Sequence, residues 1–408
     1  MKKYFLTALI LLIISVSSFP LTWKEALTLA EKNSKEIAGA KKQLEASEWS
    51  YRKAFSSILP QLSASAGMSE NTADSTTEVS RSYSSAFSVS QTLFSGLENI
   101  YNIQSAYADL EYQKATLLSV KTAYYYDLRS AYIDALVAQE NVGLSRQILK
   151  QRKQNTKLIQ LRYDSGREDQ GNLLTTKADQ ANSEHDYSAA RRDLKLSLLK
   201  LSQLLGKDVL NAESDTKFSS AGEPDLDQVL RSTPTYIIQQ KQLELAEISK
   251  NKNISEYLPS ISLSASRRST GDEWPPNTGS NSWGWNLSYS FLPGGSNIAD
   301  SFITGSQLDA ARYDFEVSIK QLRYDLENAL LNYTNALELL DVAKIQLAAA
   351  KERVDISQAK YMNGLVAYDE WYRIENTYIQ AQKGLLSAER TTFLAEAAWH
   401  KSYGGWIK

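Results

Sequence analysis

The feature of this sequence that most constrains its fold is an internal repeat. Leu59-Pro60 and Leu258-Pro259 lie 199 residues apart, and each precedes an alternation of apolar and small polar residues, QLSASAG and SISLSAS. The turns that end at Gly166 (YDSG) and Gly364 (YMNG) are offset by 198 residues, and the segments LSQLLG and WHKSYG keep that offset. A nearly constant offset between matching motifs over this length indicates that one structural unit occurs twice in the chain.

The repeat predicts how the chain is divided. We expect a signal peptide at 1–18, a first repeat at 19–206, a linker at 207–223 and a second repeat at 224–408. The linker, KDVLNAESDTKFSSAGE, is polar, as connecting segments are. Each repeat should contain, in order, a short helix, a longer helix, two strands, a very long helix and a last helix.

Hydrophobic periodicity and the positions of proline predict the helices. They are Trp23–Glu31, Lys35–Ile58, Leu97–Tyr163 and Gly171–Leu205 in the first repeat, and Leu226–Arg231, Thr235–Tyr257, Asn297–Tyr361 and Tyr368–Tyr403 in the second. The two long helices contain no proline and would each extend about 100 Å at ~1.5 Å per residue. Helices of that length need partner helices alongside them.

The second long helix carries a heptad pattern. Large residues recur every seven positions, and a small residue follows three positions after each; the large ones are Leu326, Tyr333, Leu340, Leu347, Val354 and Tyr361. This pattern predicts close packing between paired helices, as in a coiled coil. In the first repeat, Arg152 and Thr156 break a related pattern. We interpret the heptad residues as packing positions and not as a cofactor site.

The segments after each Leu-Pro are predicted to be strands with two different faces. Gln61–Ser69 and Ser260–Ser266 alternate apolar and small polar residues, the period of a β-strand. The second strand of each pair is similar and adds aromatic residues, which we expect to form a membrane aromatic belt: Tyr83, Trp283, Trp285, Tyr289 and Phe291. Such segments of about ten residues are typical of membrane β-barrels. The alternative is a soluble hairpin packed on helices.

Four strands are too few to enclose an open pore. Their free edges would expose unpaired backbone groups to lipid, which is not tolerated. The chain must therefore oligomerise around an axis if the strands cross a membrane. Three copies would supply twelve strands, enough for a water-filled pore, whereas the eight strands of two copies would be filled by side chains. Long polar loops at 71–80 and 267–282 would suit an exterior surface.

The N-terminal sequence MKKYFLTALILLIISVSS predicts a secretory signal peptide. Lys2 and Lys3 precede a mainly apolar run, and Ser17 and Ser18 supply small residues for cleavage. An uncleaved anchor is the alternative, but the run is short for a bilayer span. No other apolar run reaches the roughly 18 residues of a membrane helix, so an exported chain would cross a membrane by β-strands.

Composition excludes several functional classes. The chain has no cysteine, which removes disulfides and thiolate chemistry. Its 45 basic and 47 acidic residues give a net charge of −2, which does not suggest nucleic-acid binding. The two histidines, His185 and His400, do not fall at equivalent positions of the repeats. There is no nucleophile elbow and no glycine-rich phosphate loop, so we do not expect an enzyme.

Taken together, these motifs resemble the TolC-like outer-membrane efflux protein family. The resemblance is carried by LTWKEALTLAEKNS near the N-terminus, the Leu-Pro before each first strand, and the RYDSG and KYMNG turns. It implies a mainly α fold with membrane β-strands: a homotrimer with a twelve-stranded β-barrel in the outer membrane and a twelve-helix α-barrel across the periplasm. It also implies an export duct without cofactors, joined by a periplasmic adaptor to an inner-membrane transporter for efflux or type I secretion.

The resemblance also assigns the residues around the two turns. The periplasmic tips that meet the adaptor correspond to Tyr163, Gly166, Arg167, Tyr361, Gly364, Leu365 and Val366. The positions that line the aperture correspond to Asn172, Glu370 and Arg373. Asn172 stands where the family has an acidic residue, and Val366 where well-known members have a latching arginine. The usual ionic latch is therefore incomplete in this sequence.

Both the role of Glu370 and the class of the whole protein have an alternative interpretation. A ring of Glu370 from three subunits would line the tip, with Arg373 as a candidate partner; the alternative is a solvated helix face. For the whole protein, the rival of an export duct is a structural or adhesive coiled-coil protein of the cell envelope. That protein would use the hairpins as docking elements and would form no pore.

Overall fold

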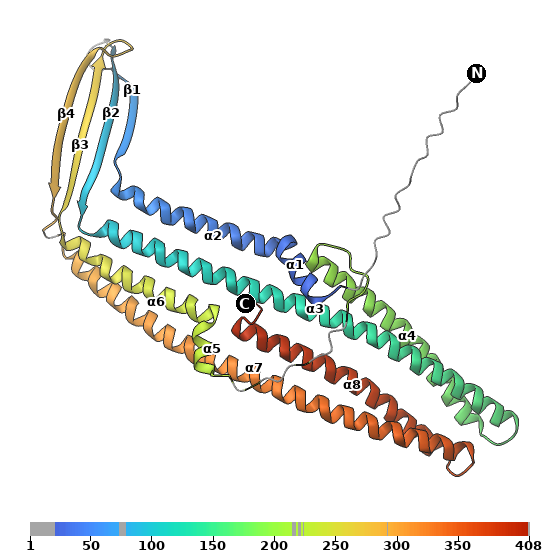
Figure 1. The fold of residues 1–408 in the computed structure, drawn as a ribbon. Helices are drawn as coiled ribbons and strands as arrows, with labels where there is room; N and C mark the ends of the chain where they lie inside the picture. The colour runs from blue at the N-terminus through green and yellow to red at the C-terminus, as the bar shows by residue number, and fades with distance from the viewer. Residues whose placement is uncertain are drawn as a thin grey trace, which may run out of the picture. The chain divides into compact units, whose positions relative to one another are not determined.

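The computed structural model describes residues 21–72, 79–213, 218, 222, 224–291 and 293–406 (Figure 1). The expected signal peptide lies outside these residues. The helices are α1 (Trp23–Asn33), α2 (Lys35–Ala54), α3 (Glu98–Asp164), α4 (Gln170–Leu205), α5 (Leu226–Ser232), α6 (Pro234–Lys252), α7 (Ser296–Met362) and α8 (Tyr368–Tyr403). The strands are β1 (Gln61–Thr72), β2 (Val79–Ser95), β3 (Ser260–Gly271) and β4 (Thr278–Ser288).

The predicted helices are confirmed, and their ends have local causes. Thr22 and Glu25 form a capping box at the start of α1, with the Glu25 N–H donating to Thr22 Oγ1 at 3.3 Å. Thr233 caps α6, whose first residue is Pro234, as the tolerance of the first turn for proline predicts. The last turns predicted for α2 and α6 are instead short 3-10 helices.

The described residues form two compact units. The turn unit comprises the described residues within 1–35, 124–222 and 329–401, and the sheet unit those within 36–123, 223–328 and 402–408. In the turn unit, α4 runs beside the second part of α3, and α8 beside the second part of α7 (Figure 1). In the sheet unit, α2 and α6 accompany the first parts of α3 and α7, respectively.

The heptad pattern of α7 is confirmed by burial. Leu326, Tyr333, Leu340, Val354 and Tyr361 are all buried, and Leu347 is half-buried. The apolar heptad side chains therefore pack against partner helices, which supplies stability that propensity alone cannot give to so long a helix.

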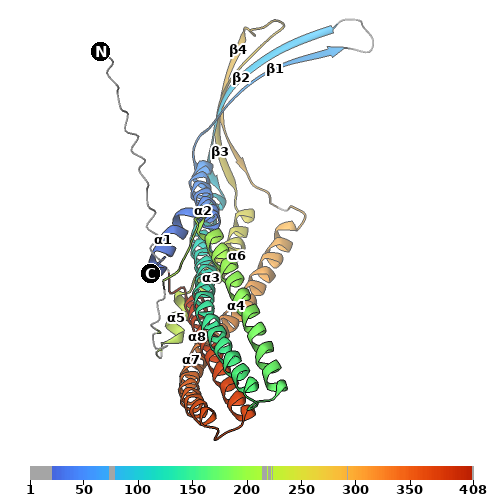
Figure 2. The same cartoon turned by 90° about the vertical axis from the view of Figure 1, so that its right-hand side faces the viewer.

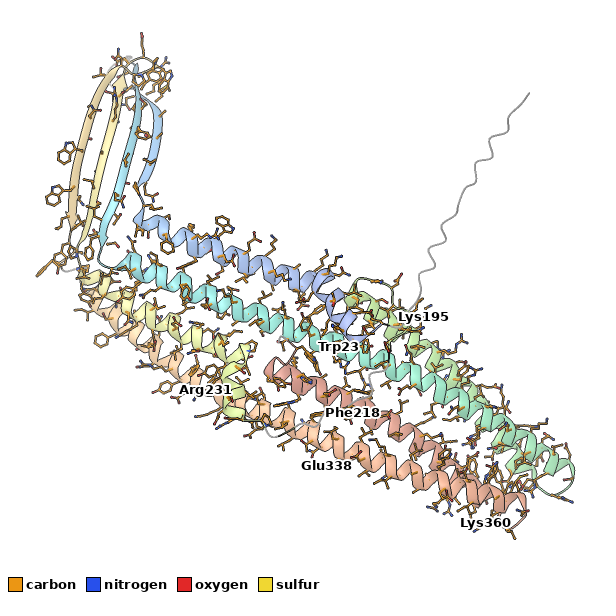
Figure 3. The ribbon with its side chains drawn as sticks, viewed as in Figure 1. Trp23, Lys195, Phe218, Arg231, Glu338 and Lys360 are labelled. Carbon is orange, nitrogen blue, oxygen red and sulfur yellow. The ribbon has the colours of Figure 1, made fainter. Side chains whose placement is uncertain are left out.

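The start of α1 is fixed to α3 by an aromatic contact in the turn unit. The ring of Trp23, labelled in Figure 3, meets that of Tyr132 edge to face with centroids 5.7 Å apart. The Arg129 guanidinium lies 4.9 Å from the centroid of the Trp23 ring. The Tyr132 hydroxyl lies 2.7 Å from the carbonyl oxygen of Leu21. These contacts anchor the chain at the first residues that the structure describes.

The four strands form one antiparallel sheet in the order β1-β2-β3-β4 (Figure 1). The register places Leu62, Val89, Ala265 and Trp283 in one row, and we name the side of the sheet that carries them the apolar face. The row of Ser63, Ser88, Ser266 and Ser282 lies on the other side, which we name the polar face. The predicted alternation of the strands is thus confirmed, except at a register shift between Thr92 and Phe94 of β2, after which Phe94 pairs with Ile261 on the apolar face.

Some strand bounds differ from those predicted. β4 ends at Ser288, so Tyr289 and Phe291 follow the strand and do not belong to it. Their rings contact each other with centroids 6.3 Å apart. β1 and β3 continue to Thr72 and Gly271 because polar residues also extend the ladders, so the loops between paired strands are shorter than predicted.

The apolar face is not covered by helices of the sheet unit. Its tryptophans Trp283 and Trp285 are 81% and 68% exposed. Leu62, Phe87 and Leu287 are exposed as well. A contiguous exposed apolar face is unusual for a soluble monomer and marks an interaction surface. None of the described helices is long and apolar enough to span a membrane.

Candidate functional site at the two helical turns

The α3–α4 and α7–α8 turns are built alike and lie close together in the turn unit (Figures 1 and 2). Gly166 has φ +72° and Gly364 has φ +74°, both in the left-handed region that glycine adopts at little cost. The N–H groups of Gly166 and Gly364 donate to the carbonyl oxygens of Tyr163 and Tyr361 at 2.9 and 3.0 Å. The repeated glycine therefore reverses the chain in the same way twice.

An aromatic cluster joins the two helical hairpins, α3–α4 and α7–α8, close to their turns. Tyr361 of α7 and Trp371 of α8 stack in parallel with ring centroids 4.7 Å apart and an interplanar angle of 2°. The ring of Tyr368 meets Trp371 edge to face at 5.9 Å. Ile159 of α3 and Leu173 of α4 complete the buried cluster. Because these residues come from four helices, the cluster packs the two helical hairpins against each other.

Tyr361 is also held by polar contacts with the first turn. Its hydroxyl donates to Glu168 Oε2 at 2.6 Å, and Arg162 Nη1 donates to its carbonyl oxygen at 3.2 Å. The Arg162 guanidinium lies 4.4 Å from the centroid of the Tyr361 ring, a cation–π geometry. Burial, followed by the hydrogen bond to Glu168, raises the pKa of Tyr361 to about 12. The phenol therefore remains a neutral donor over the physiological pH range.

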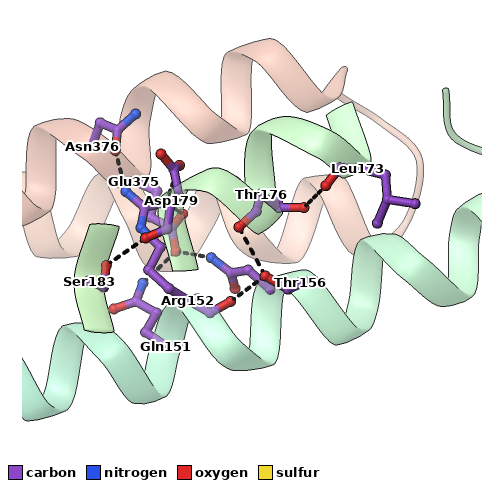
Figure 4. Close-up of polar contacts among 10 residues, drawn as sticks. Gln151, Arg152, Thr156, Leu173, Thr176, Asp179, Ser183, Glu375 and Asn376 are labelled. Carbon is purple, nitrogen blue, oxygen red and sulfur yellow. Dashed lines mark hydrogen bonds and ion pairs between the residues drawn. The ribbon is translucent and has the colours of Figure 1, made fainter. Parts of the chain in front are cut away.

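A buried ionic cluster lies further along the same helices (Figure 4). Arg152 Nη1 of α3 is 2.7 Å from Glu375 Oε2 of α8, and the Glu375 side chain is only 2% exposed. Gln151 Nε2 donates to the other Glu375 oxygen at 2.6 Å, and Asn155 also donates to it. Asp179 of α4 lies 3.5 Å from Arg152. Both oxygens of the Glu375 carboxylate thus have hydrogen-bond donors from α3. These contacts join the α7–α8 hairpin to the α3–α4 hairpin.

The residues assigned to the aperture differ in their surroundings. Asn172 is held at the start of α4, where its N–H and its side-chain amide donate to Asp169 at 2.8 Å, and the amide also donates to Glu168. Glu370 and Arg373 are both exposed in the first turns of α8. The ion pairs of the described residues do not include one between Glu370 and Arg373.

The residues assigned to the tips also separate into two groups. Tyr163, Arg167 and Leu365 are exposed, and Leu365 is 73% so. Val366 packs on the aromatic cluster, and Tyr361 is 3% exposed. The side chain of Tyr361 therefore supports the tip from inside, while the exposed residues form its surface.

Sequence reasoning missed the ionic cluster and the role of Trp371. Arg152 breaks the heptad pattern in the sequence, yet it is only 7% exposed, so a charged side chain occupies a packing position between the helices. The signal in the sequence for the ionic cluster is a charged residue at a heptad packing position, because a buried charge needs a buried partner. The partner, Glu375, lies 223 residues away, and nothing local identifies it.

No group of three or more His, Asp or Glu side chains among the described residues could hold a metal ion. His185 is exposed. His400 is partly buried, and burial lowers its pKa, followed by a smaller effect of Arg129.

Comparison with known proteins agrees with this architecture. The family model described as outer membrane efflux protein matches residues 26–207 and 228–405. The solved structure of CusC has a TM-score of 0.84 at 16% identity, covering 93% of this chain and 91% of its own. The MtrE outer membrane channel of Neisseria gonorrhoeae has a TM-score of 0.82 at 19% identity, with 95% and 89% covered.

A curated relative is also similar in sequence. Nodulation protein T of Rhizobium leguminosarum bv. trifolii is 23% identical over 318 residues, which cover 74% of this chain. The match spans 66% of that relative's own length.

Proposed function

This chain belongs to the outer membrane efflux protein family, and from that premise we propose that it forms the outer-membrane channel of a tripartite efflux or type I secretion system. Membership of the family supports an export duct, and in this proposal the protein is not an enzyme. In our proposal, substrates pass from an inner-membrane transporter through the duct, and a periplasmic adaptor joins the two. Residues 1–18 would direct export and be removed, leaving the repeats at 19–206 and 224–408 joined by the linker at 207–223.

The observation that carries this proposal is the two-faced sheet with two free edges. β1 and β4 each pair on one side only, so backbone N–H and C=O groups along both edges lack strand partners within the sheet. The apolar face is exposed, and the polar face consists mainly of serine. A sheet of this kind is stable in lipid only when neighbouring copies pair with its edges and its polar face encloses water.

Three copies satisfy these requirements. Four strands per chain would give a twelve-stranded barrel, wide enough for a water-filled lumen, whereas eight strands would be filled by side chains. The tryptophans Trp283 and Trp285, with Tyr83, would contact the lipid and its interface. The helices would line a periplasmic tunnel below the barrel.

The helices of the turn unit offer a surface that further copies could cover. A groove of about 680 Å³ runs between α7 and α8. Its lining is mainly apolar and includes Leu339 and Val342 of α7, which are 59% and 48% exposed. Exposed apolar side chains on a paired helix favour a further helix beside them. We infer that neighbouring subunits cover this face in the trimer.

The turns would then form the periplasmic end of the duct. The exposed Tyr163, Arg167 and Leu365 surround the two glycine turns and would contact the adaptor. Asn172, Glu370 and Arg373, at the starts of α4 and α8, would line the aperture. The ionic cluster of Arg152 and Glu375 would take over part of the role of the incomplete latch, because it fixes α8 to α3 within one chain.

The function is tested by asking whether the protein makes a pore. We expect the purified protein to fractionate with outer membranes, to migrate as a heat-resistant trimer in detergent, and to conduct ions in planar bilayers. A water-soluble dimer or trimer that produces no current would contradict the duct and support a structural protein of the envelope. Crosslinking in cells followed by co-purification of an adaptor and a transporter would test the tripartite assembly.

The lumen is tested by cysteine labelling, for which the cysteine-free chain gives no background. Leu263 and Ser264 are adjacent on β3 and lie on the apolar and polar faces, respectively. We expect Ser264→Cys in outer membranes to react rapidly with a charged, water-soluble thiol reagent, because water would fill the lumen. Leu263→Cys, the matched control, should react slowly because lipid covers it. Equal reactivity of the two variants would contradict the barrel.

The Glu370 ring is tested by ion selectivity. Three exposed carboxylates at a narrow tip would raise the local cation concentration. We expect Glu370→Gln to lower the cation preference of the channel in planar bilayers, whereas Glu370→Asp, which keeps the charge, should retain it. An unchanged preference in Glu370→Gln would show that Glu370 belongs to a solvated helix face.

A further inference from the structure

The polar face of the sheet carries a single charged side chain among the described strand residues. Its residues, read along each strand, are QSSGSN in β1, SSSASST in β2, SSSSRT in β3 and TSSGNS in β4. The one ionised residue among them is Arg268 of β3. The other residues of the polar face are neutral and mostly small, so Arg268 alone supplies its charge.

The row that contains Arg268 offers it no partner. Its register neighbours are Ala86 on β2 and Ser280 on β4, and Ser65 completes the row on β1. The side chain is exposed, and no ion pair of the described residues includes it. Arginine does not lose its proton in proteins, so this charge is permanent.

The other charged residues of the strands lie on the opposite face. Arg81 Nε of β2 is 2.9 Å from Glu70 Oε2 of β1, so that pair is neutral as a unit. Arg267 is adjacent to Arg268 and also exposed, but it belongs to the apolar face because successive residues of a strand alternate. The chain therefore holds two neighbouring arginines on opposite sides of one strand.

We propose that Arg268 forms an anion-binding site in the lumen, which favours passage of solutes with carboxylate or phosphate groups. This inference rests on the proposed function, since three copies of the polar face would place three guanidinium groups around one lumen. A guanidinium binds carboxylate and phosphate oxygens through paired N–H donors. Low-dielectric walls strengthen the field of such charges within a passage.

The test is a comparison of ion selectivity in planar bilayers under a KCl gradient. At about 0.1 M salt, where the screening length is ~10 Å, Arg268→Gln should lower the chloride-to-potassium permeability ratio by roughly twofold or more. Arg267→Gln removes the same charge from the adjacent residue and should leave the ratio unchanged. Arg268→Lys keeps the charge and should retain most of the wild-type ratio. At about 1 M salt, screening should reduce the effect of Arg268→Gln.

The permeability ratios of these variants support or overturn the anion site at Arg268. An unchanged ratio in Arg268→Gln channels would overturn the anion site while leaving the duct intact. An equal decrease in Arg267→Gln and Arg268→Gln would also overturn it, because the effect would then not depend on the face. A wild-type protein that forms no pores would instead refute the proposed function itself. If Arg268→Gln yields no trimer, the Arg268→Lys and Arg268→Ala channels provide the same comparison.

Discussion

Replacing Glu375 with alanine should destabilise the packing of α8 on α3 by about 3–5 kcal/mol, the cost of leaving a buried charge without its partner. The Arg152 guanidinium is 2.7 Å from Glu375, and the side chains are only 8% and 2% exposed. Without the carboxylate, Gln151 and Asn155 also lose their acceptor. Asp179, at 3.5 Å from Arg152, would compensate only in part.

Hydrogen exchange of the α8 amides would measure this effect, because it reports local opening. We expect strong loss of protection in Glu375→Ala and almost none in the control Glu370→Ala, which removes an exposed carboxylate from the same helix. The double variant Arg152→Leu, Glu375→Leu should recover much of the lost stability, because apolar residues can replace a buried ion pair. Equal protection in Glu375→Ala and Glu370→Ala would contradict this account of the cluster.

Replacing Trp371 with alanine should cost a similar amount, about 3–5 kcal/mol, for a different reason. Trp371 is 2% exposed, stacks on Tyr361 and meets Tyr368 edge to face. Its removal would leave a cavity between the two hairpins that these neighbours can fill only in part. Both turns should therefore become more mobile, although no polar contact is removed.

Limited proteolysis at the turns, together with the urea midpoint of the helical signal, would measure this change. We expect faster cleavage near Gly166 and Gly364 and a lower midpoint in Trp371→Ala. The control is Leu365→Ala, a truncation at a residue that is 73% exposed and close to the same turn. A midpoint for Trp371→Ala no lower than that of Leu365→Ala would show that the aromatic cluster does not hold the hairpins together.

For the proposed duct, both variants would also test whether the two clusters hold the tip closed. In the proposed duct, Val366 stands where the resemblance to the TolC-like family places a latching arginine, and it packs on the aromatic cluster. If the ionic and aromatic clusters hold the tip closed, both variants should raise the conductance of single channels. That measurement separates a role in gating from a role in stability alone.

Local patterns account for what could be predicted. The capping box at Thr22, proline at the start of α6 and the heptads of α7 each act within a few residues, so the helix bounds could be predicted from the sequence. The two faces of the strands were predicted for the same reason, since side chains alternate along any strand. The end of β4 was not predicted, because Tyr289 and Phe291 continue the alternation beyond the last ladder pair.

The sequence by itself determined the repeat, the helices, the strands and the positions of the two turns, because each is encoded by short-range periodicity and by glycine or proline. Only the tertiary structure decided the contacts of the residues that depart from these local patterns. Arg152 breaks a heptad locally, yet it meets Glu375 from the other repeat. Arg267 and Arg268 fall in a segment that the sequence predicts to be a loop, and only the structure shows that β3 continues through them and so places them on opposite faces. Such pairings depend on contacts between distant segments, which no local pattern specifies.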